Sequence, residues 1–146
     1  MGKKKIVAGG GGKKNNALRA RTLSKSSQKK KKLEEGLLHV ESTYNNTRVT
    51  LTDLSGNVYY TSSSGALGYK GAKKGTPFVA AQVGEVVGEQ SISAGVKKVS
   101  VRVKGVGAGR ESAIRSFIGK GIEILSIKDI TPVPHNGPRP KKARRV

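Results

Sequence analysis

The chain contains no cysteine and few aromatic side chains, with four tyrosines, two phenylalanines and no tryptophan among 146 residues. Without thiols, disulfide bonds, thiolate metal sites and cysteine nucleophiles are excluded. The aromatic rings are too few for a platform that stacks the bases of a single strand. If the protein binds a nucleic acid, the sequence favours recognition of backbone and shape.

Long hydrophobic runs are also absent, and none approaches the roughly 18 residues of a transmembrane helix. A secretory signal is not expected, because no hydrophobic region follows the basic residues 1 to 5. A mitochondrial transit peptide stays open as an alternative, since residues 1 to 33 hold serine and arginine but no acid. Their charge is mostly clumped lysine without an amphipathic period, which counts against that alternative.

Acidic side chains are scarce, with 9 Asp+Glu against 29 Lys+Arg and a formal net charge of +20. The excess lies at the ends, because residues 1 to 33 carry 12 basic residues and residues 131 to 146 carry five, both without an acid. Residues 34 to 130 are nearly balanced, with 12 basic and nine acidic residues. A compact chain with this charge repels itself unless a polyanion supplies counter-charge. Nucleic acid is the leading partner, and an anionic membrane surface is the alternative.

The charge distribution predicts three parts. Residues 1 to 33 are expected to form a basic disordered arm, because their few apolar residues cannot offset the entropy of ordering. RNA phosphate would order this arm, and a solubilising or nuclear-targeting role is the alternative. Residues 34 to 130 are expected to form the globular domain. Residues 131 to 146 are expected to form a basic, flexible tail whose prolines reduce the entropy lost when it docks.

The spacing of apolar residues in the central part predicts five strands and two helices. The strands are expected near residues 38–41, 48–52, 58–61, 98–104 and 122–130, and the helices near residues 77–95 and 113–121. The order βββαβαβ predicts an α/β sandwich with a mixed five-stranded sheet. Phe78 and Phe117 are expected in its core.

Small residues are expected to shape the first helix. Thr76 is a candidate N-cap before a proline, and Gly95 is a candidate C-cap. Gly84 and Gly88 cost the helix about 1 kcal/mol each relative to alanine. Their spacing would let a neighbouring backbone approach closely.

Residues 105 to 110 form a glycine-rich loop between a predicted strand and a predicted helix, and Asp129 follows 20 residues after Gly109. That spacing is similar to a dinucleotide-binding fingerprint. However, Arg110 stands where the fingerprint needs glycine or alanine, and only 17 residues follow Asp129, too few for a doubly wound sheet. We prefer an anion site formed by exposed N–H groups at the helix start beside Arg110. A tight turn that needs glycine is the structural alternative.

Enzymatic chemistry is not expected elsewhere. A two-metal nuclease would need clustered carboxylates, but the outer residues of the fourth strand, at 98, 100, 102 and 104, are lysine, serine, arginine and lysine. His39 and His135 share no metal-ligand spacing, and residues 62–64 are serines without a nearby base. The scattered acids are interpreted as surface or ion-pairing residues, namely Glu41, Asp53, Glu85, Glu89 and Asp129. We therefore expect no enzyme, no cofactor and no metal.

A second glycine-rich segment, residues 64–75, holds Lys70, Lys73 and Lys74. Its glycines would let the backbone approach a ligand, and its lysines suit phosphate. The sequence favours RNA contact here over a merely solvated loop.

Several motifs, taken together and in order over about residues 36 to 146, resemble the small-subunit ribosomal protein eleven family. They are YNNT at 44–47 with VTLTD at 49–53, the segment from SG to KKGTPF at 64–78, VKG to GRES at 103–112, and DITPVPHNG at 129–137. The resemblance implies a ribonuclease-H-like body without nuclease activity. It implies a place on the platform of the small subunit that bridges rRNA helices near the messenger exit and the Shine–Dalgarno cleft.

The resemblance also implies neighbours and a source. Ribosomal proteins seven and eighteen would lie beside this chain, with messenger RNA nearby and no membrane. The HNG sequence at 135–137 and the direct loop at 104–111 resemble bacterial or organellar members. The long N-terminal arm and the glycine-rich first helix depart from the family pattern and indicate a divergent lineage.

Carried over motif by motif, RNA contacts are implied at the following residues: Asn45, Asn46, Thr47, Lys70, Lys73, Lys74, Gly107, Gly109, Arg110, His135, Asn136, Arg139, Lys141, Lys142, Arg144 and Arg145. A general nucleic-acid compaction protein remains the alternative, because the cationic tails alone would support it. A platform protein should prefer its folded rRNA at moderate salt, whereas a compaction protein should bind duplex DNA equally well.

Overall fold

The computed structural model describes residues 32–145, so the predicted N-terminal arm lies almost wholly outside the described residues. Within this range, no helix is long and apolar enough to cross a lipid bilayer. The elements are β1 (Glu35–Ser42), β2 (Thr47–Thr52), β3 (Val58–Ser63), the 3-10 helix η1 (Gly71–Gly75), α2 (Pro77–Ser93), β4 (Lys98–Lys104), α3 (Gly109–Ile118) and β5 (Glu123–Asp129). The predicted βββαβαβ order is confirmed.

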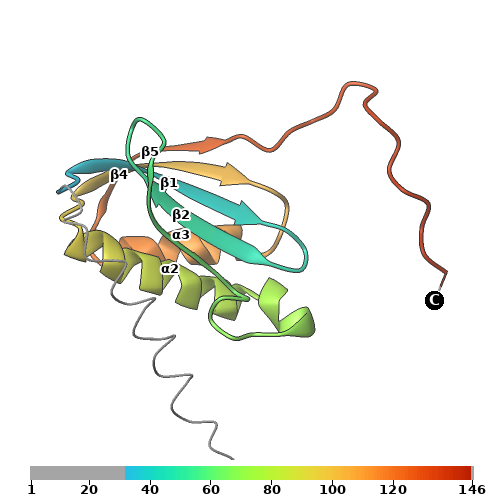
Figure 1. The fold of residues 1–146 in the computed structure, drawn as a ribbon, viewed down its shortest axis with the longest axis horizontal. Helices are drawn as coiled ribbons and strands as arrows, with labels where there is room; N and C mark the ends of the chain where they lie inside the picture. The colour runs from blue at the N-terminus through green and yellow to red at the C-terminus, as the bar shows by residue number, and fades with distance from the viewer. Residues whose placement is uncertain (1–31, 146) are drawn as a thin grey trace, which may run out of the picture. The chain divides into compact units, whose positions relative to one another are not determined.

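The five strands form one mixed sheet in the order β3-β2-β1-β4-β5 (Figure 1). Short turns join β1 to β2 and β2 to β3, and these neighbours pair antiparallel. The connections through α2 and α3 are long enough to return the chain, so β1, β4 and β5 run parallel. This is the ribonuclease-H-like arrangement that the family resemblance implies.

Both α-helices cover the same face of the sheet, and the core lies between the two layers (Figure 1). Leu38 of β1 pairs with Leu51 and with Val101, so one apolar row crosses three strands. Phe117 of α3 is fully buried, as predicted. Burying each such side chain contributes about 1.5–3 kcal/mol. The opposite face of the sheet has no helix over it in the described part of the chain.

The two helices meet where α2 has no side chain. A Cβ atom at Gly84 would collide with the backbone carbonyl of Ala113 in α3. A Cβ atom at Gly88 would lie 2.8 Å from Cγ of Lys120. The predicted close backbone approach is confirmed at Gly84, whereas at Gly88 the neighbour is a side chain.

The start of α2 differs from the prediction in two details. Phe78 is 69 % exposed rather than in the core, because the buried face of the helix begins with Val79 and Ala80 and repeats at Val83. Thr76 occupies the N-cap position, but its hydroxyl donates to the carbonyl of Lys73 at 2.7 Å instead of capping a helical N–H. Gly95 follows the C-cap with a φ of 88°, so the predicted glycine ending is confirmed.

Candidate nucleic-acid interface

Three loops that are far apart in the sequence meet at one end of the sheet, which we call the loop end (residues 43–46, 70–75 and 105–108). Because β1, β4 and β5 are parallel, their carboxyl ends lie at the same edge, where open α/β sheets commonly bind ligands. Gly75 lies against the carbonyl of Tyr44, and Gly107 lies against the carbonyl of Thr43. The structure therefore brings together the turn, the lysine loop and the glycine loop that the sequence singled out separately.

The turn after β1 is closed on itself and exposes its tip. The backbone N–H of Thr43 donates to the carbonyl of Asn46 at 2.8 Å, and the N–H of Asn46 donates to Oγ1 of Thr43 at 3.1 Å. Tyr44 is 79 % exposed, and Asn45 is also exposed. These two side chains are therefore available to a partner.

Thr47 and Asn46 lie deeper than the tip. Thr47 is fully buried, its Oγ1 lies 3.2 Å from Oγ of Ser42, and its N–H donates to Oγ of Ser64 at 3.3 Å. Oδ1 of Asn46 is the one buried side-chain polar atom in the described range without a hydrogen-bond partner. An unmet buried acceptor costs about 1–3 kcal/mol. Thr47 thus supports the turn, while Oδ1 of Asn46 is buried there without a hydrogen-bond donor among the described residues.

The glycine loop is packed rather than open. Gly107 is buried and its N–H donates to the carbonyl of Ser42 at 2.9 Å, so the expectation of an exposed N–H is wrong at this residue. Gly109 is buried too, and a Cβ atom there would lie 2.6 Å from Cβ of Ala80. Gly105 has a φ of 100°, a conformation that glycine adopts most easily. The structural alternative, a tight turn that needs glycine, describes what these residues do inside the fold.

Arg110 is held by partners within the chain. Its Nη1 donates to the carbonyl of Gly105 at 2.8 Å, and its Nη2 forms an ion pair with Asp129. The hydroxyl and N–H of Thr131 donate to Asp129 at 2.6 and 2.8 Å, and Oγ1 of Thr131 accepts from the N–H of Gly105 at 3.1 Å. The hydrogen bonds from Thr131 and then from Arg110 lower the pKa of Asp129 to about 2. Gly105, Arg110, Asp129 and Thr131 thus fix the point at which the C-terminal tail leaves the body, and we call these four residues the clamp.

The lysine loop is the cationic part of the loop end. Lys70 and Lys73 are exposed and Lys74 is half-buried. Within residues 32–145 the ion pairs are Lys98–Glu123, Lys104–Glu41, Arg110–Asp129 and Lys120–Glu89, so none of these three lysines has a carboxylate partner. Their charge is available to an external anion.

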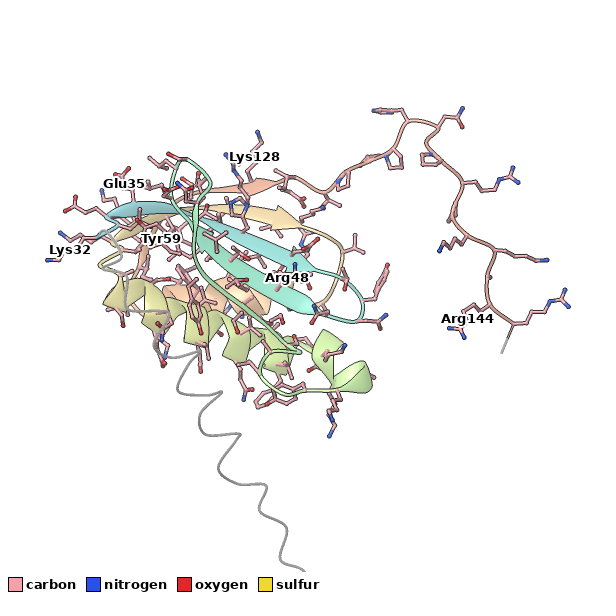
Figure 2. All side chains as sticks on the ribbon, viewed as in Figure 1. Lys32, Glu35, Arg48, Tyr59, Lys128 and Arg144 are labelled. Atoms are coloured by element: carbon pink, nitrogen blue, oxygen red, sulfur yellow. The ribbon has the colours of Figure 1, made fainter. Side chains whose placement is uncertain are left out.

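The tail after Thr131 has no helix or strand through residue 145, and the predicted contact residues in it are exposed. They are His135, Asn136, Arg139, Lys141, Lys142, Arg144 and Arg145. Asn136 has a φ of 55°, which places a bend between two proline-containing segments. Figure 2 shows the side chain of Arg144 on this extended segment. None of the tail cations pairs with a described carboxylate, so the tail is a second source of free positive charge.

Sequence reasoning missed the residues that hold the loop end together. Ser42, Ser64 and Thr131 are hydrogen-bonded supports, and although Ser64 and Thr131 lie within the family motifs, none of the three was predicted to have a role in the site. Asp129 was expected to be a surface or ion-pairing residue, and its pair with Arg110 confirms that interpretation. The Asp-x-Thr spacing of residues 129–131 was the available signal, because such side chains often bond to nearby backbone.

Residues 32–145 contain no group of three or more His, Cys, Asp or Glu side chains that could hold a metal ion. A mixed α/β sheet with loops at one end, unpaired lysines among them and a cationic tail is an arrangement typical of nucleic-acid-binding proteins.

A comparison with protein families matches residues 36–145 to the family described as ribosomal protein S11. The match spans most of the chain, so this protein belongs to the ribosomal protein S11 family. It is accordingly a structural, non-enzymatic constituent of the small ribosomal subunit that binds rRNA and other ribosomal proteins and serves translation in the ribosome. The resemblance found in the sequence motifs is confirmed.

Proposed function

We propose that this protein binds and bridges rRNA helices on the platform of the small subunit, near the messenger exit and the Shine–Dalgarno cleft. The observation that carries the proposal is the gathering of unpaired cations at the loop end and in the tail that leaves from it. Phosphate contacts by lysine and arginine supply affinity and fix orientation without reading base sequence.

Bridging follows from having two cationic parts on one chain. Lys70, Lys73 and Lys74 project from a loop that packs on the β1–β2 turn, whereas the five basic residues of the tail extend from the clamp at Thr131. Each part can bind phosphates of a different helix. The chain then keeps the two helices close to each other.

Within the proposal, the predicted contact residues divide into two kinds. Asn45, the three lysines and the tail residues from His135 to Arg145 touch RNA directly, and Asn46 offers its unmet hydrogen bond. Thr47, Gly107 and Gly109 position the turn and the glycine loop from inside the fold. Arg110 holds the tail, and its remaining donors face a phosphate. We further propose that ribosomal proteins seven and eighteen are neighbours, that messenger RNA passes nearby, and that the ribosome is bacterial or organellar.

The test is a salt titration of the full chain on transcribed small-subunit rRNA. Log affinity falls as log salt rises, and each lost phosphate contact should make this slope less steep by about 0.7–0.9. The double variant Lys70→Gln/Lys73→Gln should therefore lower the slope by about 1.4–1.8. A charge-matched control, Lys97→Gln/Arg115→Gln, removes two exposed cations outside the loop end and the tail and should leave the slope unchanged.

Two outcomes would count against the proposal. Equal slopes for the two double variants would mean that the lysine loop contributes only overall charge. Equal binding of the unmodified chain to duplex DNA and to folded rRNA at moderate salt would favour the general compaction alternative.

A further inference from the structure

The face of the sheet opposite α2 and α3 carries a row of polar side chains that crosses all five strands. In register, Thr61 of β3 pairs with Thr50 of β2, which pairs with His39 of β1. His39 pairs in turn with Arg102 of β4, and Arg102 pairs with Lys128 of β5. We call these five residues the open-face row. At about 4.8 Å between strands, the row is about 19 Å long.

The charge of this row is unbalanced, in contrast to two other rows on the same face. Lys98 pairs in register with Glu123 at 3.6 Å, and Lys104 pairs with Glu41 at 3.8 Å, so those pairs match opposite charges. Arg102 instead lies directly beside Lys128, and neither has a carboxylate partner among residues 32–145. Like charges side by side repel each other. An external anion on this face would offset that repulsion.

The remaining side chains of the row suit a phosphodiester. The hydroxyls of Thr50 and Thr61 lie 2.9 Å apart beside a shallow hollow of about 390 Å³ that Arg48 also lines. Arg48 likewise has no described carboxylate partner, and Figure 2 shows Lys128 directed away from the helices. Burial and then the charge of Arg102 lower the pKa of His39, so its imidazole favours the neutral form. Among the described residues that line the hollow, Val58 is the one large apolar side chain, and the row itself consists of hydroxyls, an imidazole and cations. Such side chains fit a sugar–phosphate backbone better than an apolar protein surface.

We propose that the open-face row is a second RNA-binding surface, on which Arg102 and Lys128 bind phosphates of rRNA. The hydroxyls of Thr50 and Thr61, which bond to each other and to the carbonyl of Val49, provide a polar surface beside them. The inference rests on the proposed function, since it takes rRNA as the ligand, but it uses a surface separate from the loop end and the tail. Three surfaces would then hold RNA. Arg48, at the start of β2, lies where the open face approaches the loop end.

The first experiment compares charge-matched double variants of the full chain by salt titration on the same rRNA transcript. Arg102→Gln/Lys128→Gln should reduce the salt slope by about 1.4–1.8, whereas Lys97→Gln/Arg115→Gln should not change it. The face variant should also melt at no lower a temperature than the unmodified chain in the absence of RNA, because a like-charge repulsion has been removed.

The outcomes separate the inference from the proposed function. If the unmodified chain fails to bind the transcript, the proposed function itself fails. If Lys70→Gln/Lys73→Gln lowers the slope and Arg102→Gln/Lys128→Gln does not, the loop end binds RNA and the open-face inference is overturned. A fall in melting temperature with an unchanged slope would assign the two cations a structural role and would also overturn it.

The second experiment identifies the occupant in assembled small subunits. Because the chain has no cysteine, Thr61→Cys provides a unique and exposed thiol on the row for a benzophenone cross-linker. A cross-link to rRNA supports the inference, and a cross-link to a protein assigns the face to a protein partner and overturns it. Gln90→Cys, exposed on α2 in the helical layer, serves as the matched control site.

Discussion

At the scale of single residues, Arg110 shows that an arginine at an expected ligand site can instead bind partners within its own chain. Its place after a glycine loop and at a helix start predicts a phosphate contact. In the structure its guanidinium instead joins the carbonyl of Gly105 to the carboxylate of Asp129. That carboxylate lies 19 residues away in the sequence, so no local pattern indicates the pair. Contact between Arg110 and RNA stays a prediction, to be made by the donors that these partners leave free.

The clamp predicts that the carboxyl group of Asp129 titrates at an unusually low pH. Folding lowers the pKa of Asp129 from 3.8 to about 2, mainly through the hydrogen bonds from Thr131. Protonation of this carboxyl is therefore less favourable in the folded chain, so its stabilising contribution is complete above about pH 4 and is lost as the pH falls toward 2. Carbon-detected NMR of the Asp129 carboxyl should show a midpoint near pH 2.

A control variant isolates the cause of that shift. Thr131→Val removes the hydroxyl that donates to Asp129, so the midpoint should move toward the usual aspartate value while the Arg110 ion pair keeps it somewhat low. A midpoint near 3.8 in the unmodified protein would contradict the clamp.

At the scale of elements, the strands and helices could be predicted because their apolar spacing follows the burial of one sheet face and one helix stripe. The prediction for Phe78 was wrong because this residue lies about 100° around α2 from Val79, where the buried stripe begins. A large apolar side chain outside that stripe stays exposed. The meeting of three loops could not be predicted, because alternation tells which face a side chain occupies but not which strands are neighbours. Both the loop end and the open-face row depend on the order β3-β2-β1-β4-β5.

The contact between α2 and α3 makes a prediction about its glycines. Gly84→Ala should destabilise the fold by about 1–3 kcal/mol, because the added methyl meets the immovable backbone of Ala113 and outweighs the gain in helix propensity. Gly88→Ala should cost less, because the atom that it meets belongs to the flexible side chain of Lys120. Urea unfolding of both variants measures the difference. Equal losses of unfolding free energy would show that backbone contact does not distinguish the two positions.

At the scale of the whole molecule, the described helices and strands lie in the body, and the tail adds exposed positive charge without them. The described body buries its apolar rows and has nearly balanced numbers of basic and acidic residues, whereas the tail has exposed cations and no helix or strand. The family match covers the body and the tail together, from residue 36 to residue 145. Folding and the tail's share of RNA binding should therefore be separable by truncation.

Removal of residues 135–146 tests that separation. The variant keeps Thr131 and its clamp, so cooperative unfolding should remain within about 0.5 kcal/mol of the full chain. The five basic residues are lost, so the steepness of the salt dependence of rRNA binding should fall by as much as about 3.5–4.5. Calorimetry and salt titration on one preparation measure both quantities. A truncated chain that no longer unfolds cooperatively, or that keeps its full slope, would show that the tail and the body do not divide these tasks.

The clamp at Thr131 has a consequence for the kinetics of assembly. Because Thr131 fastens the tail to Gly105 of the glycine loop, the 14 residues from 132 to 145 can reach no farther than about 46–50 Å from that anchor. Once the lysine loop has bound one helix, the tail searches for its own phosphates at an effective concentration that the tether sets, and the second contact becomes intramolecular. Either contact can then break and re-form without releasing the other, so the tether converts two weak contacts into one long residence time.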